Sequence, residues 1–139
     1  PDSWRDLAAA LEAAADAGDL DEVNRLEAHL WLDGPTAPEG RVGGAARELF
    51  LAMNGRALAA DDPGETVGVP ERWEGLEQLT MPGLVLVGDL DTEEEQGAAE
   101  QLAAMIPGAR FEKLEGTAHL PHVEGHERTF ALISEFLMV

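Results

Sequence analysis

Asp91 and His119 are the two residues whose types and positions could do chemistry together. Asp91 follows the apolar run 84–87 and His119 follows the run 109–114, in each case through a loop that contains glycine, and a helical pattern comes next. Parallel strands of such strand–loop–helix units end at the same edge of a sheet, so we expect the two side chains to be neighbours. A carboxylate beside an imidazole is two-thirds of a nucleophilic triad.

The nucleophile of such a triad has no candidate in this sequence. The chain has no cysteine, and its serines are Ser3, at the start, and Ser134, in the last expected helix. Neither lies in a Gly-x-Ser-x-Gly turn, the strand-to-helix elbow that exposes a catalytic serine. The sequence therefore predicts an acid and a base without their nucleophile, and we expect the chain alone to be inactive.

Both residues also have an ordinary structural interpretation. Asp91, with Glu94 three residues later, has the pattern of a helix N-cap and its capping box. His119 alone would be an ordinary loop histidine. The matching positions of the two residues, each after a strand of the same sheet, favour the triad interpretation over both alternatives.

A metal site is a further alternative. His119, His122 and His126, with Glu124 between them, have the density of a metal-ligand cluster. Pro121 and the start of a helix disfavour the convergence of three rings, so we predict no metal and no cofactor.

The strand–helix units occupy residues 81–139, with helices expected over 93–106 and 127–137. The second of these helices places Phe130, Ile133 and Leu137 on one apolar stripe. Two parallel strands leave ladder edges and apolar faces uncovered, so we expect a partner surface.

An all-helical segment precedes these units. Helical periodicity covers residues 3–18, 19–32 and 42–59, rich in alanine and poor in large side chains, which suggests helices that cover another surface rather than form a core of their own. The predicted division is a helical segment 1–60, a linker with a short helix 61–80, and the strand–helix units 81–139.

The acidic composition excludes two classes of partner. Lys and Arg number 9 against 28 Asp and Glu in 139 residues, for a net charge of −19. Such a surface repels nucleic-acid phosphates and anionic lipids. No apolar stretch reaches the roughly 18 residues of a membrane span, and the first residues lack the pattern of a secretory signal. We expect a cytoplasmic protein that binds neither nucleic acid nor a membrane.

Two motifs resemble those of the α/β-hydrolases of the esterase and enol-lactonase type. Residues 87–91 (Val-Gly-Asp-Leu-Asp) match a Val-Gly-x-x-Asp signature, and residues 116–119 (Gly-Thr-Ala-His) match a Gly-x-x-His signature. Residues 30–35 (Leu-Trp-Leu-Asp-Gly-Pro) resemble the helical cap that such enzymes insert before their last strands.

The resemblance implies the fold class, the site and the reaction. The fold is α/β, the carboxyl-terminal portion of an α/β-hydrolase: two parallel strands with flanking helices plus an all-helical cap over 1–60. Asp91 is then the triad acid and His119 the base of ester or lactone hydrolysis. The nucleophile and oxyanion hole belong to a missing amino-terminal half, which is the implied partner.

Two questions stay open at this point. The chain could instead be a non-catalytic truncated module that pairs its exposed strand edge with a second copy of itself. Four large apolar residues of the helical segment either line a substrate pocket under the cap or only pack the helices together. They are Trp31, Leu32, Phe50 and Met53.

Overall fold

The computed structural model describes residues 2–61, 64 and 73–138. Half of the predicted linker segment 61–80, namely residues 62–63 and 65–72, lies outside this range. None of the described helices is both long and apolar enough to cross a membrane.

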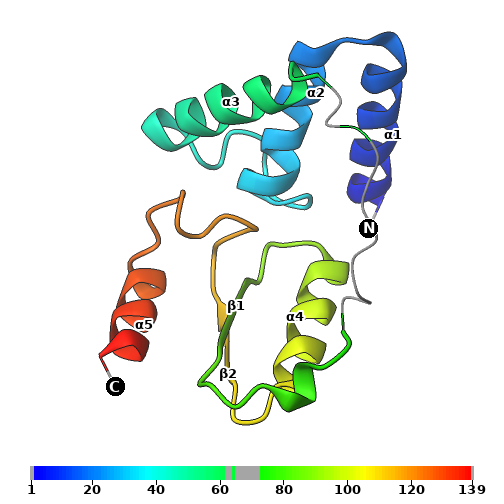
Figure 1. The fold of residues 1–139 in the computed structure, drawn as a ribbon. Coiled ribbons are helices and arrows are strands. Elements are labelled where there is room, and N and C mark those ends of the chain that lie inside the picture. Colours follow the sequence, from blue (N-terminus) through cyan, green and yellow to red (C-terminus); the bar gives the residue numbers. More distant parts are fainter. Residues whose placement is uncertain (1, 62–63, 65–72, 139) are drawn as a thin grey trace.

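The amino-terminal segment is helical, as predicted. It contains α1 (Asp2–Ala17), α2 (Leu20–Glu27), a π-helical turn η1 (Ala28–Asp33) and α3 (Gly44–Leu58), shown in blue to green in Figure 1. Gly18, with φ of 67°, ends α1, and the Asp19 side chain caps α2 by accepting from the backbone N–H of Glu22. The left-handed backbone at Gly18 is what allows the tight turn between the two helices.

The helices form a core of their own, contrary to the sequence-based expectation. Their apolar stripes meet each other where α1 packs on α2, and the buried residues are Leu7, Ala14, Val23, Leu26 and Leu30. α3 has no buried residue and exposes Leu49 and Met53, but it too packs against this core through Leu58.

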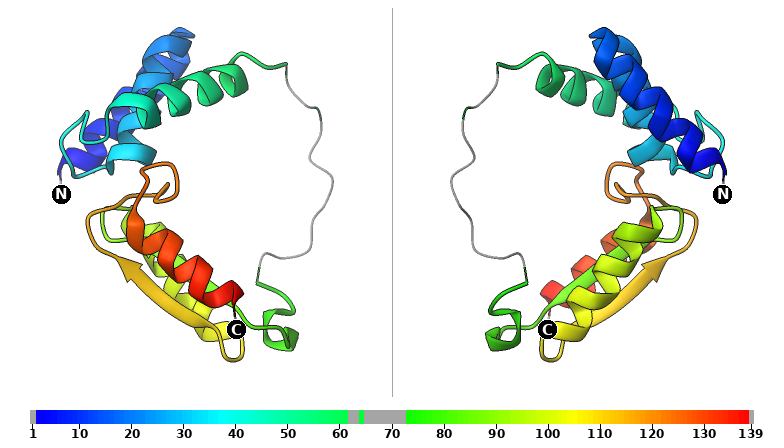
Figure 2. Two further views of the ribbon diagram at one scale, coloured as in Figure 1. Left: turned by 90° about the vertical axis from the view of Figure 1, so that its left-hand side faces the viewer. Right: turned by 90° about the vertical axis from the view of Figure 1, so that its right-hand side faces the viewer.

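The second part of the chain is a two-stranded parallel sheet with a helix on each face. The elements are β1 (Leu84–Gly88), α4 (Glu93–Met105), β2 (Arg110–Leu114) and α5 (Glu127–Leu137), with a 3₁₀ turn η2 (Leu76–Gln78) before them. The register runs from Leu84 opposite Arg110 to Gly88 opposite Leu114. Figures 1 and 2 show α4 and α5 on opposite sides of the strands. The α/β class and the parallel pairing are therefore confirmed.

The apolar stripe of α5 is exposed, and the helix buries a different face. Phe130 is 49%, Ile133 37% and Leu137 75% exposed, whereas Thr129 and Leu132 are buried. A stripe that repeats at helical spacing marks a surface to be covered, and within the described part of the chain nothing covers this one.

Gly88 determines how closely the loop before His119 packs on β1. A Cβ atom at position 88 would lie 2.1 Å from the carbonyl oxygen of Thr117 and 2.4 Å from that of Ala118. Both neighbours are backbone atoms, so no side-chain rotation relieves the contact. Glycine is required here by the close approach of two chain segments.

We expect Gly88→Ala to lower the free energy of unfolding by about 2–3 kcal/mol, the usual range for overpacking against backbone. Urea denaturation followed by circular dichroism measures this loss. The matched control is Gly97→Ala in α4, where a Cβ atom meets nothing within 4 Å. Since alanine favours helix, the control should stabilise the chain by about 0.5–1 kcal/mol. Equal effects of the two changes on the free energy of unfolding would contradict the conclusion that glycine is required at position 88.

Candidate functional site

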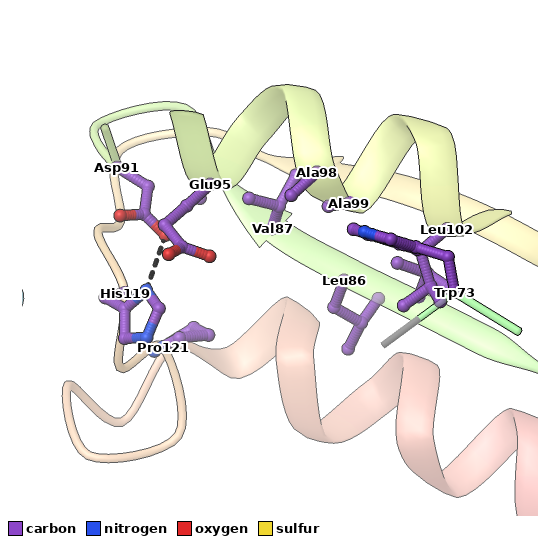
Figure 3. A pocket seen from close by; sticks show the side chains of 12 residues that line it. Trp73, Leu86, Val87, Asp91, Glu95, Ala98, Ala99, Leu102, His119 and Pro121 are labelled. Carbon is purple, nitrogen blue, oxygen red and sulfur yellow. Dashed lines mark hydrogen bonds and ion pairs between the residues drawn. The ribbon is translucent and has the colours of Figure 1, made fainter. Parts of the chain in front are cut away.

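Asp91 and His119 lie side by side at the carboxyl ends of β1 and β2, as the sequence predicted. The Nδ1 atom of His119 lies 2.8 Å from Oδ2 of Asp91, a contact drawn as the dashed line in Figure 3. The Asp91 side chain is 3% exposed and that of His119 is 39% exposed. A buried carboxylate thus holds one edge of an imidazole whose other edge reaches solvent.

The alternative that Asp91 is the N-cap of α4 is wrong. Thr92 is the N-cap, since its Oγ1 accepts from the backbone N–H of Glu95 at 3.1 Å. The second oxygen of Asp91, Oδ1, accepts from the backbone N–H of Thr92 at 2.8 Å. Gln96 donates to the carbonyl of Asp91 at 2.8 Å. The loop therefore directs Oδ2 towards the histidine and not towards the helix.

The electrostatics of the site favour protonation of His119. The hydrogen bond with Asp91 is the main cause that raises the pKa of His119 above its ordinary value; burial opposes it, and the negative charges of Asp91 and Glu95 add to it. The indole ring of Trp31 lies against the imidazole, with ring centroids 4.9 Å apart and planes inclined at 53°. These contacts orient the ring and bias its charge.

The bond to Asp91 also selects the tautomer of His119. A carboxylate only accepts hydrogen bonds, so the neutral ring carries its hydrogen on Nδ1 and keeps a lone pair on Nε2. In the described part of the chain no side chain hydrogen-bonds Nε2. The ring is therefore arranged to accept a proton from a group outside these residues.

Glu124 holds the backbone just before His119. Its Oε1 accepts from the Thr117 hydroxyl at 2.6 Å and from the backbone N–H of Ala118 at 2.8 Å. The sequence offered Glu124 only as a candidate metal ligand. Its actual role is to anchor the loop.

Arg41 connects this loop to the helical segment. It pairs with Oε2 of Glu124 at 2.8 Å and donates to the carbonyl of Gly116 at 3.0 Å. On the helical side it donates to the carbonyls of Leu32 at 2.8 Å and Asp33 at 2.6 Å. The backbone N–H of His119 itself donates to the carbonyl of Trp31 at 3.2 Å. The helical segment and the loop that carries His119 are thus one hydrogen-bonded unit.

Asp33, which is fully buried, fixes the segment that carries Arg41. Its Oδ2 accepts from the backbone N–H of Gly40 at 2.8 Å and from Arg47 at 2.8 Å, and its Oδ1 accepts from the backbone N–H of Val42 at 2.9 Å. Sequence reasoning missed Arg41, Asp33 and Arg47. The available signal was an acidic residue directly before a Gly-Pro turn, which indicates a turn but not its partners.

Asp91 borders a hollow of about 520 Å³ together with Trp31 and Glu94. Two further hollows lie around His119 and the loop that follows it. One, of about 310 Å³, extends along β1 and α4 and ends at Asp91, Glu95, His119 and Pro121 (Figure 3). The other is an apolar groove, also of about 310 Å³, between α3 and the loop after His119, and it includes Phe50, Met53, Leu120 and Val123.

The four residues considered for a substrate pocket separate into three roles. Trp31 makes a tilted ring contact with His119, Leu32 is fully buried, and Phe50 and Met53 line the apolar groove. Packing is therefore the role of Leu32, whereas Trp31 borders the imidazole of His119, and Phe50 and Met53 border the groove.

Two of the three histidines considered as metal ligands have separate partners. His126 contacts the Thr129 hydroxyl through Nδ1 at 3.1 Å, and His119 contacts Asp91. No cluster of three or more acidic, histidine or cysteine side chains suited to a metal ion occurs among the residues that the structure describes. Ser134 is exposed on α5, and the side chain of Ser3 is outside the described atoms.

Comparison with protein-family models, with curated proteins and with solved structures gave no match. The assignment to the α/β-hydrolases therefore stays a prediction from motifs. The geometry adds a carboxylate–imidazole pair at a shared sheet edge, in which Nδ1 of His119 faces the carboxylate of Asp91 and Nε2 faces away from it.

Proposed function

We propose that this chain supplies the acid and the base of a serine-type catalytic triad in an α/β-hydrolase that cleaves esters or lactones. The observation that carries the proposal is the 2.8 Å contact between Nδ1 of His119 and the buried Oδ2 of Asp91, with Nε2 left open. The orientation of this pair matches the division of roles in such triads, in which the carboxylate fixes the tautomer and the imidazole moves the proton.

The reaction follows from the open Nε2 atom. Nε2 of His119 accepts the proton of a hydroxyl nucleophile as the hydroxyl oxygen attacks the carbonyl carbon of the ester. The imidazolium, stabilised by Asp91, returns that proton to the leaving alcohol, and an acyl-enzyme remains. Water then gives one proton to Nε2 and its oxygen attacks the acyl carbon. The imidazolium returns that proton to the departing hydroxyl oxygen as the acid is released, which regenerates both the hydroxyl and the neutral ring.

The nucleophile belongs to a segment outside residues 1–139, either continuous with this chain or on a separate one. Neither serine of the sequence lies in an elbow motif, and the chain has no cysteine. The helical segment fits the role of a cap, because it lies over the loops at the ends of the strands and hydrogen-bonds them through Arg41 and Trp31 (Figure 1).

A fluorophosphonate probe, which reacts with activated serine hydroxyls, tests the proposal. The complete product of the natural reading frame, or its complex with any co-purifying subunit, is incubated with the probe and digested for mass spectrometry. We expect an adduct on a serine outside residues 1–139, lost in the His119→Ala variant. Residues 1–139 alone should hydrolyse p-nitrophenyl acetate no faster than 4-methylimidazole at equal concentration.

Two outcomes would reject the proposal. One is a His119-dependent adduct on Ser3 or Ser134 of the isolated chain, which would put the nucleophile within it. The other is the absence of any adduct on the complete product while its His119–Asp91 hydrogen bond is visible by NMR.

A non-catalytic homodimer is the second candidate, and it is favoured by the outer edge of β1, with which no strand of the described residues pairs. A sedimentation equilibrium experiment on the complete product decides it, since only this candidate requires a stable dimer without esterase activity.

A further inference from the structure

Trp31 connects the core of the helical segment to the ring of His119. It lies in η1 and is partly buried against the apolar core that α1 and α2 form. Its indole also contacts the imidazole, with ring centroids 4.9 Å apart, and its backbone carbonyl accepts from the backbone N–H of His119 at 3.2 Å. One residue of the helical segment therefore contacts both the backbone and the side chain of His119.

The geometry of this ring contact suits a charged imidazole. The two ring planes are inclined at 53°. Tilted ring pairs are favoured because the positive edge of one ring meets the negative face of the other. A cation within about 6 Å of the centroid of a tryptophan ring is attracted by the negative face of that ring. Protonation of His119 therefore strengthens its contact with Trp31.

The charged groups around the imidazole act in the same direction. Asp91, from the loop after β1, and Glu95, from α4, are the carboxylates whose negative charges raise the pKa of His119. Arg41 of the helical segment pairs with Glu124 of the loop after His119 at 2.8 Å. The imidazole is thus bordered by two carboxylates and an indole, and each of these groups favours the imidazolium.

The helical segment fixes the orientation of the indole. η1 continues directly from α2, and its last residue, Asp33, is fully buried and hydrogen-bonded on both oxygens. Trp31 therefore lies on a rigid part of the segment, between the apolar core and the loop that carries His119. An indole held in this way needs no rearrangement when the imidazole gains a proton.

We propose that Trp31 is a positioning residue through which the helical segment stabilises the imidazolium form of His119. In the reaction proposed above, the imidazolium forms as the hydroxyl loses its proton. An interaction that is stronger with the charged ring than with the neutral one lowers the barrier to that step. The effect on the charge of His119 is a property of this chain, and its consequence for catalysis rests on the proposed function.

A series of fluorinated tryptophans tests the effect of charge without a change of shape. In the chain with Trp4→Phe and Trp73→Phe, Trp31 is the one tryptophan. It is replaced biosynthetically by monofluoro, difluoro and tetrafluoro analogues, in which each fluorine withdraws electrons from the face of the ring. The pKa of His119, measured by NMR of the imidazole nitrogens, should fall at each step. Its proton-binding constant should drop by about threefold to tenfold across the series.

Fluorination of Trp4 is the matched control. In the chain with Trp31→Phe and Trp73→Phe, Trp4 is the one tryptophan, and no ring contact joins it to His119 among the described residues. The same series of analogues at position 4 should leave the pKa of His119 unchanged. A shift equal to that of the Trp31 series would show that the ring contact is not its cause.

Two substitutions of Trp31 separate the charge effect from packing. Phenylalanine keeps a weaker aromatic face and leucine keeps none, so the pKa of His119 should be highest with tryptophan and lowest with Trp31→Leu. If Trp31 served packing alone, leucine would expose the imidazole to water, and the lower cost of its charge would raise the pKa.

The complete hydrolase gives a second readout. For Trp31→Leu, the acid limb of the pH profile of kcat/KM should move to lower pH by the change that NMR measures, and kcat on the plateau should fall by about threefold to tenfold. Trp31→Phe should restore part of both. A merely structural role predicts no such shift of the profile.

Either of two results would overturn the proposal. One is a pKa of His119 that does not depend on the number of fluorines on Trp31, a measurement that remains possible if Trp31→Leu does not fold. The other is a rise of that pKa in Trp31→Leu. The NMR measurements require no catalysis. If the pKa falls as expected but the complete product has no esterase activity, the hydrolase proposal alone fails.

Discussion

Replacing Asp33 with alanine should lower the free energy of unfolding by about 3–5 kcal/mol, the range for removing one partner of a buried ion pair. Asp33 is fully buried, and its two oxygens accept from Gly40, Val42 and Arg47. Without them two backbone N–H groups lose their acceptor and the guanidinium of Arg47 loses its counter-charge. Few other single changes in this chain remove so many buried hydrogen bonds at once.

Urea denaturation of Asp33→Ala beside the natural chain measures this loss. Asp16→Ala is the matched control, since Asp16 is exposed on α1 and should change stability by less than about 0.5 kcal/mol. The double variant Asp33→Ala, Arg47→Met should recover part of the loss, because it removes the unpaired charge as well. A loss below about 1 kcal/mol for Asp33→Ala would show that the site is not closed to water.

The same change reaches the loop that carries His119 through Arg41. Arg41 donates to the carbonyl of Asp33 and pairs with Glu124, which in turn holds the backbone of Thr117 and Ala118. Loss of order around Asp33 therefore loosens the loop that carries His119. The position of His119 therefore depends on residues of the helical segment, Asp33 and Arg41, that do not contact its ring.

Local sequence patterns were enough to predict the elements and the central pair. Apolar runs and helical spacing predicted β1, β2 and the helices that follow them, and the positions after the strands predicted that Asp91 and His119 would meet. These predictions succeed because a strand followed by a helix constrains where the next parallel strand can end.

The contacts between distant segments could not be predicted in this way. Arg41 and Glu124 are separated by most of the chain, and each has the sequence context of an ordinary surface residue. Their pairing depends on how the helical segment packs against the loops that follow the strands. The spacing of apolar residues within one helix or strand carries no information on that packing. Helical spacing likewise identified the stripe Phe130, Ile133 and Leu137 but carried no information on what covers it.

Asp91→Asn should lower the pKa of His119, because the hydrogen bond with Asp91 is the main cause that raises it. A raised pKa means that the pair stabilises the fold fully below the ordinary histidine pKa of about 6.5, and that this contribution is lost as the pH rises through the raised value. The stability difference between the natural chain and Asp91→Asn should therefore be largest near pH 6 and shrink towards pH 9.

Two-dimensional ¹H–¹⁵N NMR of the imidazole nitrogens follows both the titration and the tautomer. The control is Glu94→Gln, which removes a nearby exposed carboxylate that has no hydrogen bond to His119. In Glu94→Gln the titration midpoint of His119 should stay close to that in the natural chain. A midpoint in Asp91→Asn equal to the natural one would show that the pair does not set the charge of the ring.

The effect of Asp91→Asn on catalysis should be far larger than its effect on the fold. The amide NH₂ of asparagine donates to Nδ1, so the neutral ring carries its hydrogen on Nε2 and has no lone pair there to accept a proton. In the complete hydrolase that we propose, kcat should fall by about 10⁴-fold, as is typical of this change in serine-type triads. The fall should be in kcat with little change in KM, because the tautomer governs proton transfer and not substrate binding. If kcat falls less than about tenfold while NMR shows the altered tautomer, Nε2 of His119 is not the proton acceptor.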